Sequence, residues 1–124
     1  MIPSARFLLA FILLSGASAL HADERVEHFE GKSAETLSEA LENFSAYNDK
    51  LAAIVERETL SSEDLLEVHR LTYTLENALG KMREEMQTLA ETLETVHLAS
   101  ERAQPDTVRS AGRDYLETAR KIAD

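Results

Sequence analysis

The stretch from Ser61 to Ser100, SSEDLLEVHRLTYTLENALGKMREEMQTLAETLETVHLAS, decides the fold of this chain. Ser61 precedes a run of helix-favouring residues and Asp64 follows three positions later, which is the spacing of a capping box at a helix start. Apolar and small residues then recur in alternating steps of three and four, as in a heptad seam. The seam positions are Leu65, Val68, Thr72, Leu75, Leu79, Met82, Met86, Leu89, Leu93, Val96 and Ser100.

Gly80 is the one residue in this stretch that would interrupt a helix. A lone glycine lowers helix stability by about 1 kcal/mol but supplies no reversing loop. Further along, Pro105 disfavours helical geometry at Gln104. The pattern therefore predicts a single helix over about 62–103, roughly 60 Å long from the rise per residue.

A shorter amphipathic segment lies on each side of this helix. The first spans about 33–57, with Ser33 or Thr36 as its cap, and the second spans about 106–123. Their apolar stripes are Leu37, Leu41, Phe44, Leu51 and Val55 in the first, and Val108, Ala111, Tyr115, Ala119 and Ile122 in the second. The expected fold is all-α and bundle-like, with three helices forming antiparallel hairpins around one long central helix.

The N-terminus has the three-part layout of a secretory signal peptide. Arg6 is followed by an uninterrupted apolar run over 7–14 and then by small residues over 15–19. The run is far shorter than the roughly 20 residues that cross a bilayer, which disfavours a permanent anchor. Cleavage is expected after Ala19 or after Ala22; the second choice leaves residues 1–22 as signal peptide and 23–124 as one helical domain. That domain would begin with an extended arm over 23–32.

The chain contains no cysteine, so neither a lipid-modified N-terminus nor a disulfide is available to it. Its net charge is −10, and removal of residues 1–22, which hold Arg6 and no acid, makes it −11. Such a charge repels nucleic acid and anionic membrane surfaces. Acidic residues also keep an exported helical protein soluble without any further role.

The long apolar seam exceeds what two short helices would cover. Two copies of the long helix, antiparallel about a centre near Met82, would complete a four-helix bundle in each half and form a homodimer. In the alternative, the outer helices and the arm cover enough of the seam for a monomer. Another periplasmic protein is a further partner that this seam would accept.

Four residues on the long helix are candidate metal ligands: His69, His97, Met82 and Met86. The two histidines are about 42 Å apart in one chain, but an antiparallel dimer centred near residue 83 would bring them face to face. The two methionines lie one turn apart, a spacing suited to Cu(I). All four also lie on or beside the seam, where histidine and methionine commonly pack without a ligand.

No catalytic motif is present in the sequence. There is no glycine-rich phosphate loop, no nucleophile elbow and no metalloprotease helix motif. The expectation is that the protein is not an enzyme and has no catalytic residue or bound cofactor.

Three stretches resemble a family of small exported proteobacterial proteins of unknown function: Asp23–Phe29, Leu71–Leu79 and Val96–Glu101. The resemblance implies a periplasmic helical protein and no known activity. A likeness in size and helicity to periplasmic b-type cytochromes does not extend to their haem ligands. Those proteins use a methionine on the first helix and a histidine on the last. In this chain the first expected helix has no methionine and the last has no histidine.

The sequence thus favours an exported periplasmic protein with a non-enzymatic interaction or structural role. A metal- or haem-binding periplasmic protein is the alternative.

Overall fold

The computed structural model describes residues 29–123, and this part of the chain is helical without any strand. Its helices are α1 (Leu37–Val55), α2 (Ser62–Glu101) and α3 (Pro105–Ala123), which confirms the all-α class. The expected signal peptide over 1–22 and the first part of the expected arm lie outside the described residues. Between residues 29 and 123, none of the helices has the length and apolarity that a membrane crossing requires.

Helix α1 begins four residues later than the expected start near residue 33. Thr36 is the cap: its hydroxyl accepts from the Glu39 amide at 3.2 Å, and the Glu39 carboxylate accepts from the Thr36 amide at 3.2 Å. Of the two caps that the sequence offered, Thr36 is therefore the one used, and Ser33 lies before the helix, where its carbonyl accepts a hydrogen bond from the Asn43 side chain at 3.1 Å. This contact holds the preceding segment in an extended conformation against α1.

Helix α2 begins at the expected capping box. The Ser61 hydroxyl accepts from the Asp64 amide at 3.1 Å, and the Asp64 carboxylate accepts from the Ser61 amide at 2.8 Å. The Ser61 amide, then its hydroxyl, and the nearby Arg57 charge lower the pKa of Asp64 below its ordinary value. Arg57 lies in the turn before α2 and forms an ion pair with Asp64, so the cap also fastens the turn.

The end of α2 is a Schellman motif built on an alanine. Ala103 has φ of 52°, in the left-handed region. The Gln104 amide donates to the Ala99 carbonyl at 2.9 Å and the Ala103 amide donates to the Ser100 carbonyl at 3.3 Å. Helix α2 therefore stops at Glu101 rather than near residue 103, and Pro105 becomes the first residue of α3, where its missing N–H is not needed.

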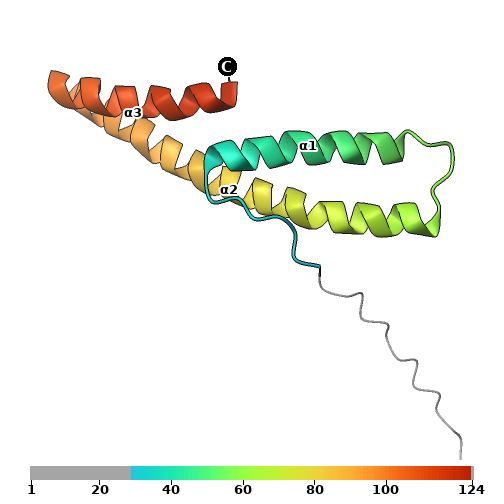
Figure 1. Ribbon diagram of the computed structural model, residues 1–124. Coiled ribbons are helices and arrows are strands. Elements are labelled where there is room, and N and C mark those ends of the chain that lie inside the picture. The colour runs from blue at the N-terminus through green and yellow to red at the C-terminus, as the bar shows by residue number, and fades with distance from the viewer. Residues whose placement is uncertain (1–28, 124) are drawn as a thin grey trace, which may run out of the picture.

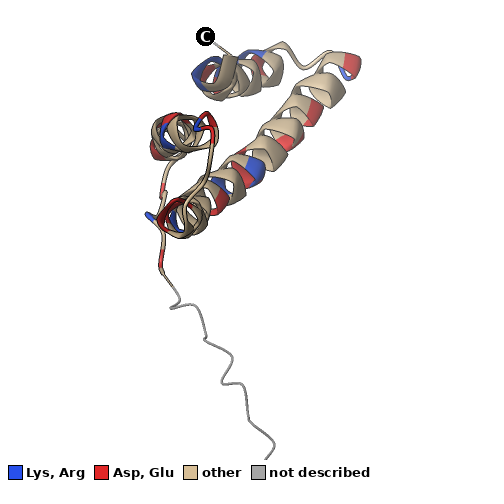
Figure 2. Cartoon of the chain, turned by 90° about the vertical axis from the view of Figure 1, so that its right-hand side faces the viewer, with Lys and Arg blue, Asp and Glu red and all other residues tan. Residues whose placement is uncertain are grey.

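The three helices form a V-shaped ribbon (Figure 1). Helix α1 packs antiparallel along the first half of α2, and α3 turns back along its second half but diverges from it toward the C-terminus, as both Figure 1 and Figure 2 show. The buried apolar residues are Leu37, Ala40, Ile54, Leu71, Leu75, Ala78 and Ala99. All but Ala99 lie on α1 or on the first half of α2, and α3 contributes none.

The heptad seam of α2 divides into two rows. One row is buried or half-buried on the side of α1 and α3, and it consists of Val68, Leu75, Met82, Leu89 and Val96. In the other row the large apolar side chains are exposed. The eleven seam positions therefore do not form a single buried seam, because the outer helices cover only one side of α2.

A candidate interaction surface on the long helix

The exposed row of α2 is the most distinctive surface feature of the described chain. Leu65, Leu79, Met86 and Leu93 occupy successive or alternate heptads of one helix face, and they are 58%, 49%, 50% and 47% exposed. Because positions seven apart lie close to one line along a helix, these side chains form an apolar stripe. We call these four residues the α2 stripe; it extends over roughly 42 Å.

The stripe is bordered by a second heptad row that carries charges. Glu76 and Arg83 lie in this row, one on each side of Leu79, and both are exposed. Within residues 29–123 neither forms a salt bridge; the nearby Lys81 pairs instead with Glu85 at 2.9 Å. The hydrogen bond that Lys81 donates to the Glu85 carboxylate, followed by the charges of Glu84 and Glu85, raises the pKa of Lys81 above its ordinary value.

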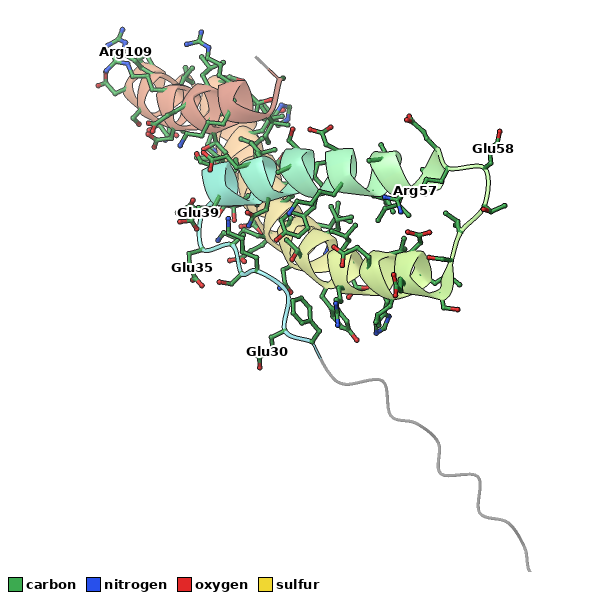
Figure 3. All side chains as sticks on the ribbon, turned by 45° about the vertical axis from the view of Figure 1, so that its right-hand side comes forward. Glu30, Glu35, Glu39, Arg57, Glu58 and Arg109 are labelled. Carbon is green, nitrogen blue, oxygen red and sulfur yellow. The ribbon has the colours of Figure 1, made fainter. Side chains whose placement is uncertain are left out.

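The N-terminal arm lies on a different face of α2. The Lys32 amide donates to the Thr74 hydroxyl at 2.9 Å, and the Asn77 side chain donates to the Lys32 carbonyl at 3.1 Å. Gly31 lies so close to α2 that an added Cβ would be 2.5 Å from the Tyr73 carbonyl carbon. In Figure 3 the labelled Glu30 and Glu35 of this arm point away from the helices. The arm therefore covers part of α2 but leaves the stripe uncovered.

Sequence reasoning missed these anchors for the arm. Thr74 and Asn43 are almost fully buried, and each accepts or donates one of the hydrogen bonds that hold residues 32–33. The sequence does contain an indication of them. Both are polar residues on otherwise apolar helix faces, where a buried polar group needs a hydrogen-bond partner.

The structure does not bring the four candidate metal ligands together within one chain. His69 lies edge-on to the Tyr73 ring, with centroids 5.1 Å apart, and the His97 ring nitrogen lies 3.3 Å from the Glu101 carboxylate. Met82 is half-buried, whereas Met86 belongs to the stripe. No group of three or more His, Cys, Asp or Glu residues suited to a metal ion occurs in the described part of the chain.

Charge is distributed unevenly along α2, as the red and blue segments of Figure 2 indicate. Residues 84–101 contain five glutamates and no lysine or arginine. The first half of α2 and the turn before it include basic residues at positions 57, 70, 81 and 83. The second half is thus the strongly acidic end of the long helix.

Several hollows open onto the surface of residues 29–123. One lies at the turn between α2 and α3 and is mainly apolar; its lining includes Ala99, Ala103, Pro105, Val108 and Arg109. Another lies beside the arm between Phe29, Tyr47 and Lys50. These two hollows lack the paired carboxylates that acid–base catalysis needs. A third lies where the arm meets α1, and its lining includes Glu35, Glu39 and Glu42; the Glu39 carboxylate there accepts from the Thr36 amide of the cap.

Comparison with known families matches residues 1–124 to a family of unknown function (DUF6746). No curated protein matches the chain, and no solved structure does.

Proposed function

We propose that this chain, which belongs to the DUF6746 family of unknown function, is an exported, non-enzymatic helical protein. It would bind the surface of another protein through the α2 stripe. The observation that carries the proposal is the row of four large apolar residues on one face of α2, each about half exposed and interrupted at Thr72. Soluble proteins rarely expose a row of large apolar side chains of this length unless a partner covers it.

The architecture suits binding better than catalysis. A ribbon of three helices presents long faces, and protein partners recognise such faces through apolar side chains at heptad spacing. Enzymes usually require a concave site in which reacting groups converge. Here the face that carries the α2 stripe runs for roughly 42 Å, while the hollows at the turn and beside the arm are open to solvent.

Export is the second part of the proposal. It is supported by Arg6, the apolar run over 7–14 and the small residues that follow, which have the composition of a signal peptide. The acidic composition and the absence of cysteine agree with a released periplasmic protein that needs no disulfide. Intact-mass measurement of protein released from the periplasm should give a chain that starts at Leu20 or Asp23; retention of residues 1–14 would contradict export by cleavage.

Binding through the stripe is tested by placing a photo-crosslinking amino acid at Leu79 or at Leu93 in living cells. A matched control carries it at Leu116, which is 45% exposed but lies on α3. We expect protein adducts of defined size from positions 79 and 93 and not from 116. Equal labelling from all three positions, or none from the stripe, would overturn the proposed function.

A further inference from the structure

The two end residues of the α2 stripe lie at equal distances from Leu79, whereas Met86, seven residues after Leu79, has Thr72 at the matching position before it. Leu65 lies fourteen residues before Leu79 and Leu93 lies fourteen residues after it. A two-fold axis near Leu79, perpendicular to the helix, would therefore place Leu65 of one copy against Leu93 of the other at both ends. At the centre, Leu79 would meet its own counterpart. Such self-complementarity is what an isologous interface between two copies requires.

The charges beside the stripe have the same symmetry with opposite signs. Glu76 lies three residues before Leu79 and Arg83 lies four residues after it. In an antiparallel pair each Glu76 thus reaches the level of the other copy's Arg83, to within one residue. In a parallel pair, Glu76 would face Glu76 and Arg83 would face Arg83, which is unfavourable.

The acidic half of α2 favours the same orientation. Parallel packing would set residues 84–101, with their five glutamates, beside the same five in the partner. Antiparallel packing moves the two acidic halves to opposite ends of the dimer, where they are far apart compared with the screening length of about 8–10 Å. Each acidic half then lies beside the partner's first half, which carries Arg70 and Lys81 but also Asp64 and Glu67, at the levels of the partner's Glu94 and Glu91. The gain from this orientation therefore comes from separating the two runs over 84–101 and not from complete charge pairing.

From these observations we infer that the partner of the α2 stripe is a second copy of this chain, packed antiparallel with the two-fold axis near Leu79. The inference rests on the proposed function, because it names the occupant of the same surface. Helix α1 and the arm pack on other faces of α2, so the described chain leaves the stripe accessible.

The charged residues fix where the two-fold axis crosses α2. An axis near residue 83 would set Arg83 against Arg83 and would remove Glu76 from its pairing. The axis near Leu79 instead leaves His69 about eight residues, or roughly 12 Å, from the level of the partner's His97. This dimer therefore does not build a shared metal site from these two histidines.

The first test is the oligomeric state of the purified protein over a concentration series by sedimentation equilibrium. We expect a monomer–dimer equilibrium that Leu79→Glu abolishes and that the matched Leu116→Glu leaves unchanged. Both side chains are about half exposed, so both variants should keep their helical circular dichroism. A wild-type monomer at all concentrations would overturn the inference.

The second test is a charge swap that keeps the fold. Glu76→Arg alone, or Arg83→Glu alone, should raise the dimer dissociation constant about tenfold, because each converts two attractive contacts per dimer into repulsive ones. The double variant, Glu76→Arg with Arg83→Glu, should restore the wild-type constant. Failure of the double variant to recover would exclude the proposed orientation.

The third test measures orientation directly, and the lack of native cysteine makes the labelling clean. Spin labels at positions 66 and 94 of different copies should lie close together. Two labels at position 66 should be roughly 39 Å apart along the axis. A short distance between the two labels at 66 would show parallel packing and contradict the inference.

The outcomes also separate this inference from the proposed function. If the purified protein is a monomer and positions 79 and 93 crosslink in cells to a different protein, the homodimer is excluded but the proposed binding function is supported. Absence of crosslinks from both stripe positions would refute the binding function itself.

Discussion

The two halves of α2 are covered by very different partners. The first half packs against α1 and the arm and contains Leu71, Leu75 and Ala78, all buried. The second half packs against α3, which has no buried residue of its own. One long helix thus passes from a packed hairpin into a loosely covered extension.

The difference follows from the side chains that each outer helix turns inward. Helix α1 contributes Leu37 and Ile54 to the core, and the arm adds hydrogen bonds to Thr74 and Asn77. The half-buried positions of α3 include Ala111, Gly112 and Ala119, in addition to larger side chains. Because burial stabilises by about 25 cal/mol per Å² of apolar surface, small side chains hold α3 less strongly. The comparison suggests that packing stabilises the first half, whereas the turn at Ala103 positions the second.

The largest expected effect is a cavity in the first half. Leu71→Ala should lower the free energy of unfolding by about 2–5 kcal/mol, because Leu71 is only 2% exposed and its loss leaves a void. Leu89→Ala removes the same atoms from a half-buried site in the second half and should cost less than about 2 kcal/mol. Urea unfolding at one low protein concentration compares the two; equal losses would mean that α3 packs as tightly as α1.

A pair of glycine substitutions probes the arm. Gly31→Ala should destabilise the fold by about 1–3 kcal/mol, since the new Cβ would meet the backbone of Tyr73 and Thr74. Gly80→Ala makes the same change inside α2, where nothing lies within 4 Å of the added carbon. It should instead stabilise the protein by up to about 1 kcal/mol. Thermal melts in which Gly80→Ala destabilises would argue against a continuous helix at residue 80.

The turn at the end of α2 predicts a stabilising change in the second half. Ala103→Gly should raise the free energy of unfolding by up to about 1 kcal/mol, because glycine adopts the left-handed conformation at 103 without a Cβ clash. The control, Ala46→Gly on the exposed face of α1, should lower it by about the same amount. If chemical denaturation gives both variants the same sign, the Schellman geometry at residue 103 is not formed in solution.

The smallest expected effect concerns the cap of α2 and its dependence on pH. The pKa of Asp64 is lower in the folded chain than its ordinary value of 3.8, so the unfolded state binds the proton more readily. The ionised carboxylate therefore contributes stability that is present above pH 3.8 and lost as the pH falls through its folded-state pKa. Asp64→Asn should be slightly less stable than wild type near pH 7, and the gap should close in acid.

Urea titrations from pH 7 to pH 2 would measure this gap, with Asp49→Asn as a control on an exposed face of α1. A gap that stays constant into acid would show that the carboxylate charge plays no part in the cap.

Much of the local structure was predictable. The Ser61–Asp64 box and the heptad spacing led to the start of α2 and to its continuation through Gly80, because capping and helical periodicity depend on residues close together in the chain. For α1 the sequence offered two caps, Ser33 and Thr36; the structure confirms Thr36, which forms a capping box with Glu39, so only the helix start near residue 33 was placed too early. The stop at Glu101 depends on Ala103 in a conformation that alanine rarely adopts.

The candidate surface was only half predictable. The sequence identifies the eleven seam positions of α2 but treats them as equivalent. The direction from which α1 and α3 approach divides them into a covered row and the exposed stripe, and it separates Met82 from Met86.

The local order of residues in this chain is sufficient to specify three helices, their caps and their apolar faces, since each of these depends on neighbours within about one turn. Which apolar residues remain in water is a property of the assembled fold. Leu75 and Leu79 are one turn apart and chemically identical, yet Leu75 is buried and Leu79 is half exposed. The reason is physical: burial depends on what packs against a side chain, and the helix that covers Leu75 is distant in sequence and approaches from one side only.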